Sequence, residues 1–457
     1  MKPFNFIVIE DPHYFAKSLD AHGEGYEAFM DFEQKCYAET AAINDAVFDY
    51  LEEQTFADVI LFGGDLSFNG EKASHEEFSE KLKKLQASGK ECYVVTAGHD
   101  IEPNPFEYND KKGGRHHIEG ISFREQYDYY RDFGYDKAIS FYKENLSYTA
   151  QIGEGVRLLV LCNDSEEKRN VPYSDELMKW AEEQAKQAKA DNQVMIAMEH
   201  YPLLPGQPIL TLVPDARQKE SRKVINMLAD NGVHICFTGH MHNNSINETK
   251  SDNGNKFYDV CTGSIIGHPA YMRHCTLEDE NTIDIKAVPI PDFEWKGIKE
   301  NQTCKEYMKA QFERMLRTII GGMKDNPEKV LSKFGAADKK ALYKPVRAVG
   351  KVFATWPVGK VARLLCVKAD KSIKDMPFIE LAVNIVRNLF EGNQPYVEGT
   401  PEGDVILKVF KKLNPVWKIL NKKLHGSQGE QLDMFEILKH TAGNYGISDY
   451  DAKLKFN

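Results

Sequence analysis

The stretch VIEDPHY, residues 8–14, ends an apolar run with two residue types that bind metals, Asp11 and His13. Four further stretches share this layout, in which an apolar run predicts a buried strand and polar residues follow at once. They are LFGGDLSFNG with Asp65, VVTAGHD with His99 and Asp100, IAMEHYPL with His200, and CFTGHMHNN with His240 and His242. Each stretch alone is a weak signal, because polar turns after strands are common. Five of them along one chain indicate a shared site.

Strand-like runs alternate with amphipathic helical patterns over the first 290 residues. The runs FIVIE, DVILFGGD, CYVVTAG, VRLLVLCND, VMIAMEH and HICFTGH are typical of buried strands. Between them, apolar residues recur at helical spacing, as in Ile43, Val47 and Leu51. From about Lys256 the pattern changes to strands alone. Strands that alternate with helices predict an α/β layered fold.

The position of the polar residues predicts what they do together. In layered α/β folds, sites form where loops leave the carboxyl ends of strands, so residues on five such loops can converge. Carboxylate and imidazole ligands suit Mn, Fe, Zn or Co rather than Ca or Mg. The sequence therefore predicts a metal site at one edge of the strands.

The chain changes character after about Lys299, where we find helical patterns and no convincing strand. Residues 301–457 hold 27 Lys and Arg against 17 Asp and Glu, whereas residues 1–300 hold 31 against 52. We therefore predict a catalytic domain at 1–298 and a basic, all-α domain at 299–457. The opposite charges favour docking of the second domain on the first. Alternatively, its lysines face solvent and its apolar stripes bury only against one another.

Bulk properties limit the function and the compartment. The net charge of −11 argues against a general nucleic-acid binder, and no apolar run approaches the roughly 18 residues of a membrane span. The eight cysteines include no CxxC pair and fit reduced thiols in a reducing compartment. The first residues, MKPFNFIVIED, do not form a signal peptide as they stand. We expect a cytoplasmic protein, with an exported form whose signal was trimmed as the alternative.

These motifs resemble the calcineurin-like metallophosphoesterase family over roughly residues 4 to 290. The family pattern is Asp-x-His, Gly-Asp, Gly-Asn-His-Asp/Glu, a lone His and Gly-His-x-His. The stretches GEKASHEEFSEKL, FGYDKAIS and LSYTAQIGEGVRLLVL also resemble a bacterial branch of cyclic-nucleotide phosphodiesterase-like proteins with an added C-terminal helical domain. The resemblance implies a β-sandwich flanked by helices, and two bound metal ions.

Residue roles follow from the resemblance by position. It implies that the first metal ion binds Asp11, His13 and His242, that Asp65 bridges both ions, and that the second binds His200 and His240. His99 stands where the family has a phosphate-contacting histidine that gives a proton to the leaving oxygen. Asp100 stands where an acidic residue orients that histidine.

One position departs from the family pattern. Gly98 replaces the asparagine that binds the second metal, and glycine has no side-chain oxygen. A water could fill the gap, or Glu199, Asp100 or Asn69 could take its place. The third alternative is a decayed site that binds without catalysis.

We therefore predict a hydrolase that cleaves a phosphate ester with two divalent ions, Mn, Fe or Zn. We expect a phosphodiester, with a cyclic nucleotide as one candidate, rather than a monoester. The rival hypothesis is a catalytically weakened metal- or ligand-binding protein. The expected partner is a small phosphate ester and not a nucleic-acid polymer. We do not expect the tail to contact a membrane surface.

Overall fold

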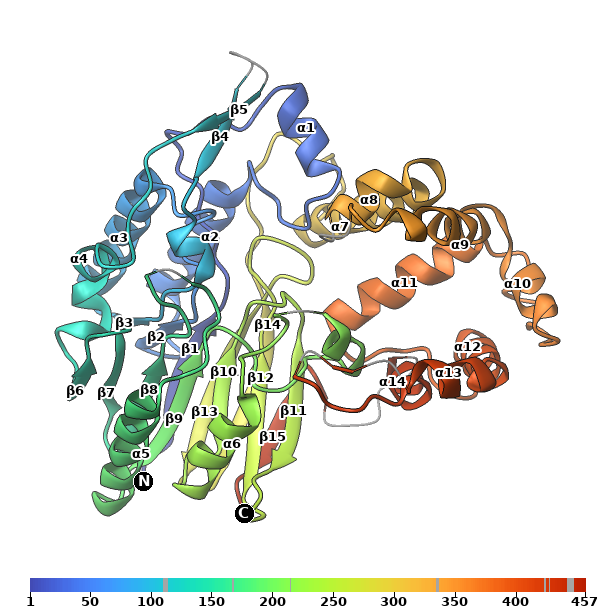
Figure 1. Ribbon diagram of the computed structural model, residues 1–457. Coiled ribbons are helices and arrows are strands. Elements are labelled where there is room, and N and C mark those ends of the chain that lie inside the picture. The colour runs from blue at the N-terminus through green and yellow to red at the C-terminus, as the bar shows by residue number, and fades with distance from the viewer. Residues whose placement is uncertain are drawn as a thin grey trace.

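The computed structural model describes residues 1–109, 114–166, 168–213, 215–333, 337–422, 425–426, 428–441 and 448–457. Its centre is a pair of β-sheets with helices around them (Figure 1). The first sheet has the strand order β15-β14-β13-β1-β2-β3. Its strands are β1 (Phe4–Ile9), β2 (Val59–Phe62), β3 (Glu91–Val94), β13 (Tyr271–Asp279), β14 (Thr282–Pro289) and β15 (Ala452–Lys455).

The second sheet has the order β11-β12-β10-β9-β8-β7-β6. Its strands are β6 (Ser140–Tyr142), β7 (Ser147–Gly153), β8 (Val156–Leu161), β9 (Val194–Glu199), β10 (Ile235–Thr238), β11 (Ser245–Lys250) and β12 (Lys256–Cys261). A hairpin of β4 (Phe106–Asn109) and β5 (Gly114–His117) stands apart from both sheets. The rings of Phe6 on β1 and Phe237 on β10 meet edge to face with centroids 5.4 Å apart. The core therefore lies between the sheets, which confirms the predicted β-sandwich.

The strands that precede the polar motifs run in parallel within each sheet. β1, β2 and β3 are parallel neighbours, and so are β8, β9, β10 and β12. Their carboxyl ends therefore meet at one edge of the sandwich, as the sequence predicted.

Six α-helices of the first part flank the sheets: α1 (Glu24–Met30), α2 (Thr40–Glu53), α3 (Lys72–Ala87), α4 (Gln126–Tyr130), α5 (Asp175–Ala190) and α6 (Ser221–Asp230). The predicted inner face of α2 is buried, since Ile43, Val47 and Leu51 are fully inaccessible. The later helices are α7 (Cys304–Asp325), α8 (Pro327–Lys333), α9 (Tyr343–Thr355), α10 (Val358–Leu364), α11 (Phe378–Glu391), α12 (Pro401–Lys412), α13 (Asn414–Leu420) and α14 (Met434–Thr441).

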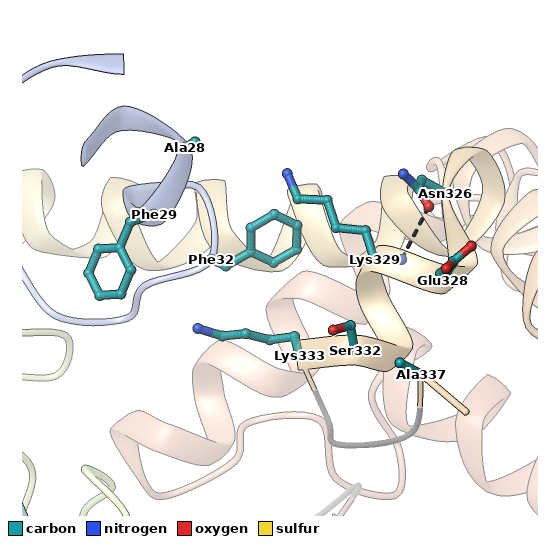
Figure 2. Close-up of a pocket in the computed structure, with 9 residues that line it drawn as sticks. All are labelled: Ala28, Phe29, Phe32, Asn326, Glu328, Lys329, Ser332, Lys333 and Ala337. Atoms are coloured by element: carbon teal, nitrogen blue, oxygen red, sulfur yellow. Dashed lines mark hydrogen bonds between the residues drawn. The ribbon is translucent and has the colours of Figure 1, made fainter. Parts of the chain in front are cut away.

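The later helices extend to one side of the sandwich and dock against it (Figure 1). The ring of Phe312 on α7 lies 5.3 Å from that of His268, and the Asn244 amide donates to the Phe390 carbonyl at 2.9 Å. On α8, Lys329 lies over the Phe32 ring beside α1 (Figure 2). Ion pairs also join the two parts of the chain, between Arg217 and Glu430 and between Glu278 and Lys453.

The C-terminal region is helical from α7 to α14, as predicted, but its last residues form a strand that was not expected. Residues 452–455 form β15, which pairs antiparallel with β14 at the edge of the first sheet. The strand alternates buried and exposed residues, with Leu454 only 2% exposed. The end of the chain therefore belongs to the sandwich, and the division at residues 298 and 299 remains a prediction.

Candidate metal centre

The six residues predicted to bind metals come together at the carboxyl edge of the sandwich. They form two groups whose ligand atoms lie within 4.8 Å of one another. The first group contains Asp11, His13 and His242, and the second contains Asp65, His200 and His240. Asp11 and His13 follow β1, Asp65 follows β2, His200 follows β9, and the last two histidines follow β10.

In the first group, ring nitrogens and a carboxylate face a common point. His13 Nε2 and His242 Nε2 are 3.1 Å apart. Asp11 Oδ1 lies 3.2 Å from His242 Nε2 and 3.6 Å from His13 Nε2. Two imidazole nitrogens that face each other beside a carboxylate fit a cation, because both can then act as electron-pair donors.

Asp65 lies between the two groups. Its Oδ2 is 3.2 Å from His200 Nε2 and 3.6 Å from His13 Nε2. His200 Nε2 is buried and has no hydrogen-bond partner among the described residues. The same carboxylate oxygen therefore faces a histidine of each group.

Hydrogen bonds outside the two groups fix how the ligand side chains point. His200 Nδ1 donates to the Gly63 carbonyl at 3.0 Å, which leaves its Nε2 for the centre. His240 Nε2 donates to the Asp215 carbonyl at 3.0 Å, which leaves its Nδ1. The backbone amide of His240 donates to Asp11 Oδ2 at 2.9 Å. Such outer contacts set the tautomer and the ring orientation of metal-binding histidines.

The backbone at the centre is strained. Five of the six residues have positive φ: Asp11 (52°), His13 (38°), Asp65 (49°), His240 (64°) and His242 (53°). Residues other than glycine rarely adopt positive φ angles. Such conformations persist where the surrounding structure enforces them, often at functional sites. The strain allows short loops to turn both residues of Asp-x-His and of His-x-His toward the centre.

The electrostatics favour ionised carboxylates at the centre. Burial by itself would raise the pKa of Asp11, but His242 and His200 lower it below its usual range. Burial likewise opposes ionisation of Asp65, and His200 and His99 reverse that effect, so its pKa is also lowered. Both carboxylates therefore carry the negative charge that attracts cations.

The protonation states of the histidines also suit metal binding. Burial lowers the pKa of His13 and of His240 to about 4, so both rings are neutral at pH 7. Burial acts the same way on His200, but Asp65 and Asp11 raise its pKa well above the usual value. Metal binding displaces protons from its ligands. A metal ion bound to His200 would therefore supply the positive charge that the proton now supplies to Asp65 and Asp11. The residues present therefore fit two metal ions.

Gly98 leaves space that other side chains use. A Cβ built on residue 98 would stand 2.9 Å from the Tyr201 hydroxyl and 2.8 Å from Arg169 Cδ. Tyr201 packs against both histidines of the second group, with ring centroids 5.1 Å from His200 and 4.3 Å from His240. The φ angle of Gly98 is outside the left-handed region. A side chain at position 98 would therefore have to displace Tyr201 or Arg169 beside the second group.

The side chains considered as substitutes for the missing asparagine have other contacts. Glu199 Oε2 accepts from the Tyr173 hydroxyl at 2.6 Å, and Asn69 Oδ1 lies 3.0 Å from His99 Nδ1. Asp100 is bound to backbone amides, as described next. The described contacts give none of the three a place in the second group.

In the described contacts the Asp100 carboxylate does not bond the His99 ring, and its role in orienting His99 stays a prediction. The Asp100 carboxylate accepts from the backbone amides of Ser67 at 2.7 Å and Ala97 at 2.9 Å, so it holds the loop. His99 instead donates from Nδ1 to Asn69 Oδ1, and its backbone amide donates to Asp65 Oδ1 at 2.9 Å. The acidic side chain next in sequence turns inward, because it caps the 3-10 turn Gly98–Ile101.

Three further residues near the centre were not predicted. Glu10 precedes Asp11, is fully buried, and has two carboxylate oxygens without described hydrogen-bond partners. Burial raises its pKa well above the usual value. Lys35 and Arg169 come from segments without a motif. The only signal for Glu10 was its place beside Asp11, and nothing in the sequence indicated the other two.

The comparison with known proteins agrees with this geometry. A sequence profile of the family described as calcineurin-like phosphoesterase matches residues 4–244. The chain belongs to the calcineurin-like phosphoesterase family. The two candidate groups of metal ligands agree with this membership. The resemblance inferred from the motifs is confirmed for the family, and the narrower branch remains a prediction.

Individual relatives of the chain are distant. The uncharacterized metallophosphoesterase-like protein YydB of Bacillus subtilis (strain 168) is 24% identical over 258 residues, and the match covers 50% of each chain. The chain thus spans about half the length of this curated relative. A dimetal phosphatase from Danio rerio is 14% identical with a TM-score of 0.43, covering 62% of this chain and 95% of that one. The purple acid phosphatase PPD1 from yellow lupin (Lupinus luteus) is 15% identical with a TM-score of 0.41, and the match covers 64% of this chain and 52% of that one.

Proposed function

We propose that the protein hydrolyses small phosphodiesters, with two divalent ions held by the two groups around Asp65. The observation that supports this most directly is the position of Asp65 Oδ2, 3.2 Å from His200 Nε2 and 3.6 Å from His13 Nε2. A shared carboxylate brings two cations close and partly offsets their repulsion. When bound, the ions would hold phosphoryl oxygens and lower the pKa of a water nucleophile. Mn, Fe or Zn suits this donor set.

His99 is the proposed proton donor to the leaving oxygen. Its Nδ1 is held by Asn69, so Nε2 is the nitrogen available to substrate. Burial and the charge of Lys35 lower the pKa of His99 well below its usual value. An anionic phosphate beside the ring would oppose both effects and restore the acidic form. We assign to Asp100 the role of holding the loop that carries His99. Asn69 is assigned the role of orienting the His99 ring.

The substrate class rests on charge and on the resemblance. Residues 1–300 are strongly acidic, which disfavours a nucleic-acid polymer and leaves a small ester as the proposed partner. A diester is proposed over a monoester because of the resemblance to phosphodiesterase-like proteins. The second candidate is a weakened enzyme that mainly binds ligand, which Gly98 favours because Tyr201 and Arg169 fill the space of a metal-binding side chain.

Turnover of a diester and a monoester tests the proposal. We expect bis(p-nitrophenyl) phosphate to be hydrolysed in the presence of Mn²⁺ with a higher kcat/KM than p-nitrophenyl phosphate. An Asp65→Asn variant should be inactive on both. A preference for the monoester would overturn the diester assignment. Two tightly bound metal ions without turnover of either ester would favour the binding protein.

A further inference from the structure

Lys35 has an unusual environment for a lysine. It lies in the segment between α1 and α2 and is only 6% exposed. Its Nζ is 4.4 Å from the centroid of the Phe68 ring. Among the residues that the structure describes, the ammonium has no hydrogen-bond or ion-pair partner. A buried charge without a partner is costly, and a cation–π contact offsets only part of that cost.

The ammonium lies on the side of the metal centre where His13 and His99 meet. The Phe68 ring under Lys35 is 5.9 Å from the ring of His13. The His13 ring is in turn 4.8 Å from that of His99. One phenyl ring therefore separates the Lys35 ammonium from the place where the proposed proton donor meets the first metal group.

The position of Lys35 is fixed by the residues around it. The amide of Cys36 donates to the Ile266 carbonyl at 2.8 Å, and the hydroxyl of Ser264 donates to the Asp11 carbonyl at 2.6 Å. The segment that carries Lys35 is thus attached to the loop that supports a predicted metal ligand. From the other side, Gln311 on α7 donates to the carbonyls of Met30 and Glu33 at 3.1 and 3.3 Å. A mobile surface lysine has no such support.

Among the described residues no carboxylate forms an ion pair with Lys35, although the charge of Lys35 acts on buried Glu71 and lowers its pKa against the effect of burial. Glu33 Oε1 accepts from the backbone amides of Gln34 and Lys35 at 2.9 and 3.2 Å, which engages that side chain locally. The buried Glu71 is bound through Oε2 to the Asn69 amide at 3.0 Å. A positive charge thus remains available to an anion at the centre.

We propose that Lys35 Nζ binds a non-bridging oxygen of the phosphate group, as a substrate-binding residue outside the metal motifs. This inference rests on the proposed function of the same site and names a further contact for its substrate. A charge-assisted hydrogen bond from the ammonium would hold the phosphoryl group against His99. It would also offset the negative charge that grows on the phosphoryl oxygens when the nucleophile adds. The helix α7 would then act on catalysis indirectly, because it supports the segment that carries Lys35.

Phosphate binding to the manganese-loaded full chain tests this proposal without relying on turnover. Calorimetric titration with inorganic phosphate should give a Kd that rises about 10- to 100-fold in Lys35→Met, since hydrogen bonds to charged groups are worth about that much. Lys35→Arg should retain part of the affinity. The matched control is Lys329→Met, which also removes a lysine over a phenyl ring, with Nζ 4.7 Å from the Phe32 centroid (Figure 2). Unlike Lys35, Lys329 is exposed. Both methionine variants should keep the metal content of the wild type.

Several results would overturn the proposal. An unchanged phosphate Kd in Lys35→Met, or a rise equal to that of Lys329→Met, would leave Lys35 with a packing role only. If Lys35→Met fails to fold, Lys35→Gln takes its place, and wild-type affinity in that variant counts against the proposal. The proposal is also overturned if the manganese-loaded wild type shows no measurable phosphate binding. Lys35-dependent binding without ester hydrolysis would instead contradict the proposed function and leave this inference standing.

Discussion

The hydroxyl of Tyr201 lies 2.9 Å from the position that a Cβ on residue 98 would take, so a side chain at this position would compete with Tyr201 for one space. The resemblance implies that Gly98 stands where the family has an asparagine ligand, so Gly98→Asn would be the simplest way to restore that ligand. In the structure this graft would displace Tyr201, which is 4% exposed and packs against His200 and His240. Tyr201 and Arg169 occupy the space beside Gly98 that a larger side chain would need.

Gly98→Asn should therefore destabilise the protein rather than tighten the second metal site. Overpacking of this kind costs about 1–3 kcal/mol. Adding Tyr201→Phe removes the hydroxyl and should recover part of the loss. The measurements are the free energy of unfolding and a manganese titration for both variants. Tighter manganese binding by Gly98→Asn alone, at unchanged stability, would show that the space is open.

His99→Ala should keep the metal ions and lower kcat by about 10²- to 10⁴-fold, the usual contribution of general acid catalysis. Asn69→Ala should have a smaller effect in the same direction, because it frees His99 Nδ1 without removing the ring. The pH dependence of kcat should shift in Asn69→Ala, since the hydrogen bond sets the tautomer. Loss of metal ions in His99→Ala would mean that the histidine is a ligand instead.

His75 should make the folded state sensitive to acid. Burial lowers its pKa from 6.5 to about 3, and its ring is bonded to the Tyr130 hydroxyl and the Asp100 carbonyl. Between these pH values the unfolded chain binds a proton that the folded protein does not. The contribution of His75 to the free energy of unfolding therefore falls by about 1.4 kcal/mol for each pH unit below 6.5.

Denaturant unfolding of wild type and His75→Gln at pH 7 and pH 5 measures this effect. Other buried histidines also titrate, so the difference between the two proteins isolates His75. The stability of the variant should fall less on acidification. Equal losses in both proteins would show that His75 is not the group responsible.

Leu454→Ala should destabilise the sandwich although it lies at the end of the chain. Leu454 is 2% exposed on β15, and truncation of a buried leucine typically costs about 2–5 kcal/mol. The control is Lys453→Ala, whose ion pair with Glu278 is at the surface and is worth little. Denaturant midpoints of both variants compare the two effects. Similar small shifts in both would indicate that β15 is dispensable.

Much of the fold and the metal centre could be predicted because they depend on local patterns. Apolar runs showed the strands, and each run led directly into polar residues such as Asp65 and His200. The partner of His99 could not be predicted, since Asn69 and His99 are 30 positions apart and meet only through the fold. The role proposed for Lys35 could not be predicted either, because Lys35 and Phe68 also meet only through the fold. The strand β15 has four residues, too few for periodicity to show it.

The central claim is that Asp65 holds two metal ions in one site. Metal analysis of protein purified without chelator, with Asp65→Ala and the surface control Asp45→Ala beside the wild type, tests it most directly. Asp45 pairs with Lys17 away from the two groups and should not matter. The account predicts two metal ions per chain in the wild type and in Asp45→Ala, and loss of both in Asp65→Ala. Two ions per chain in Asp65→Ala, or none in the wild type even after incubation with Mn²⁺, would contradict it.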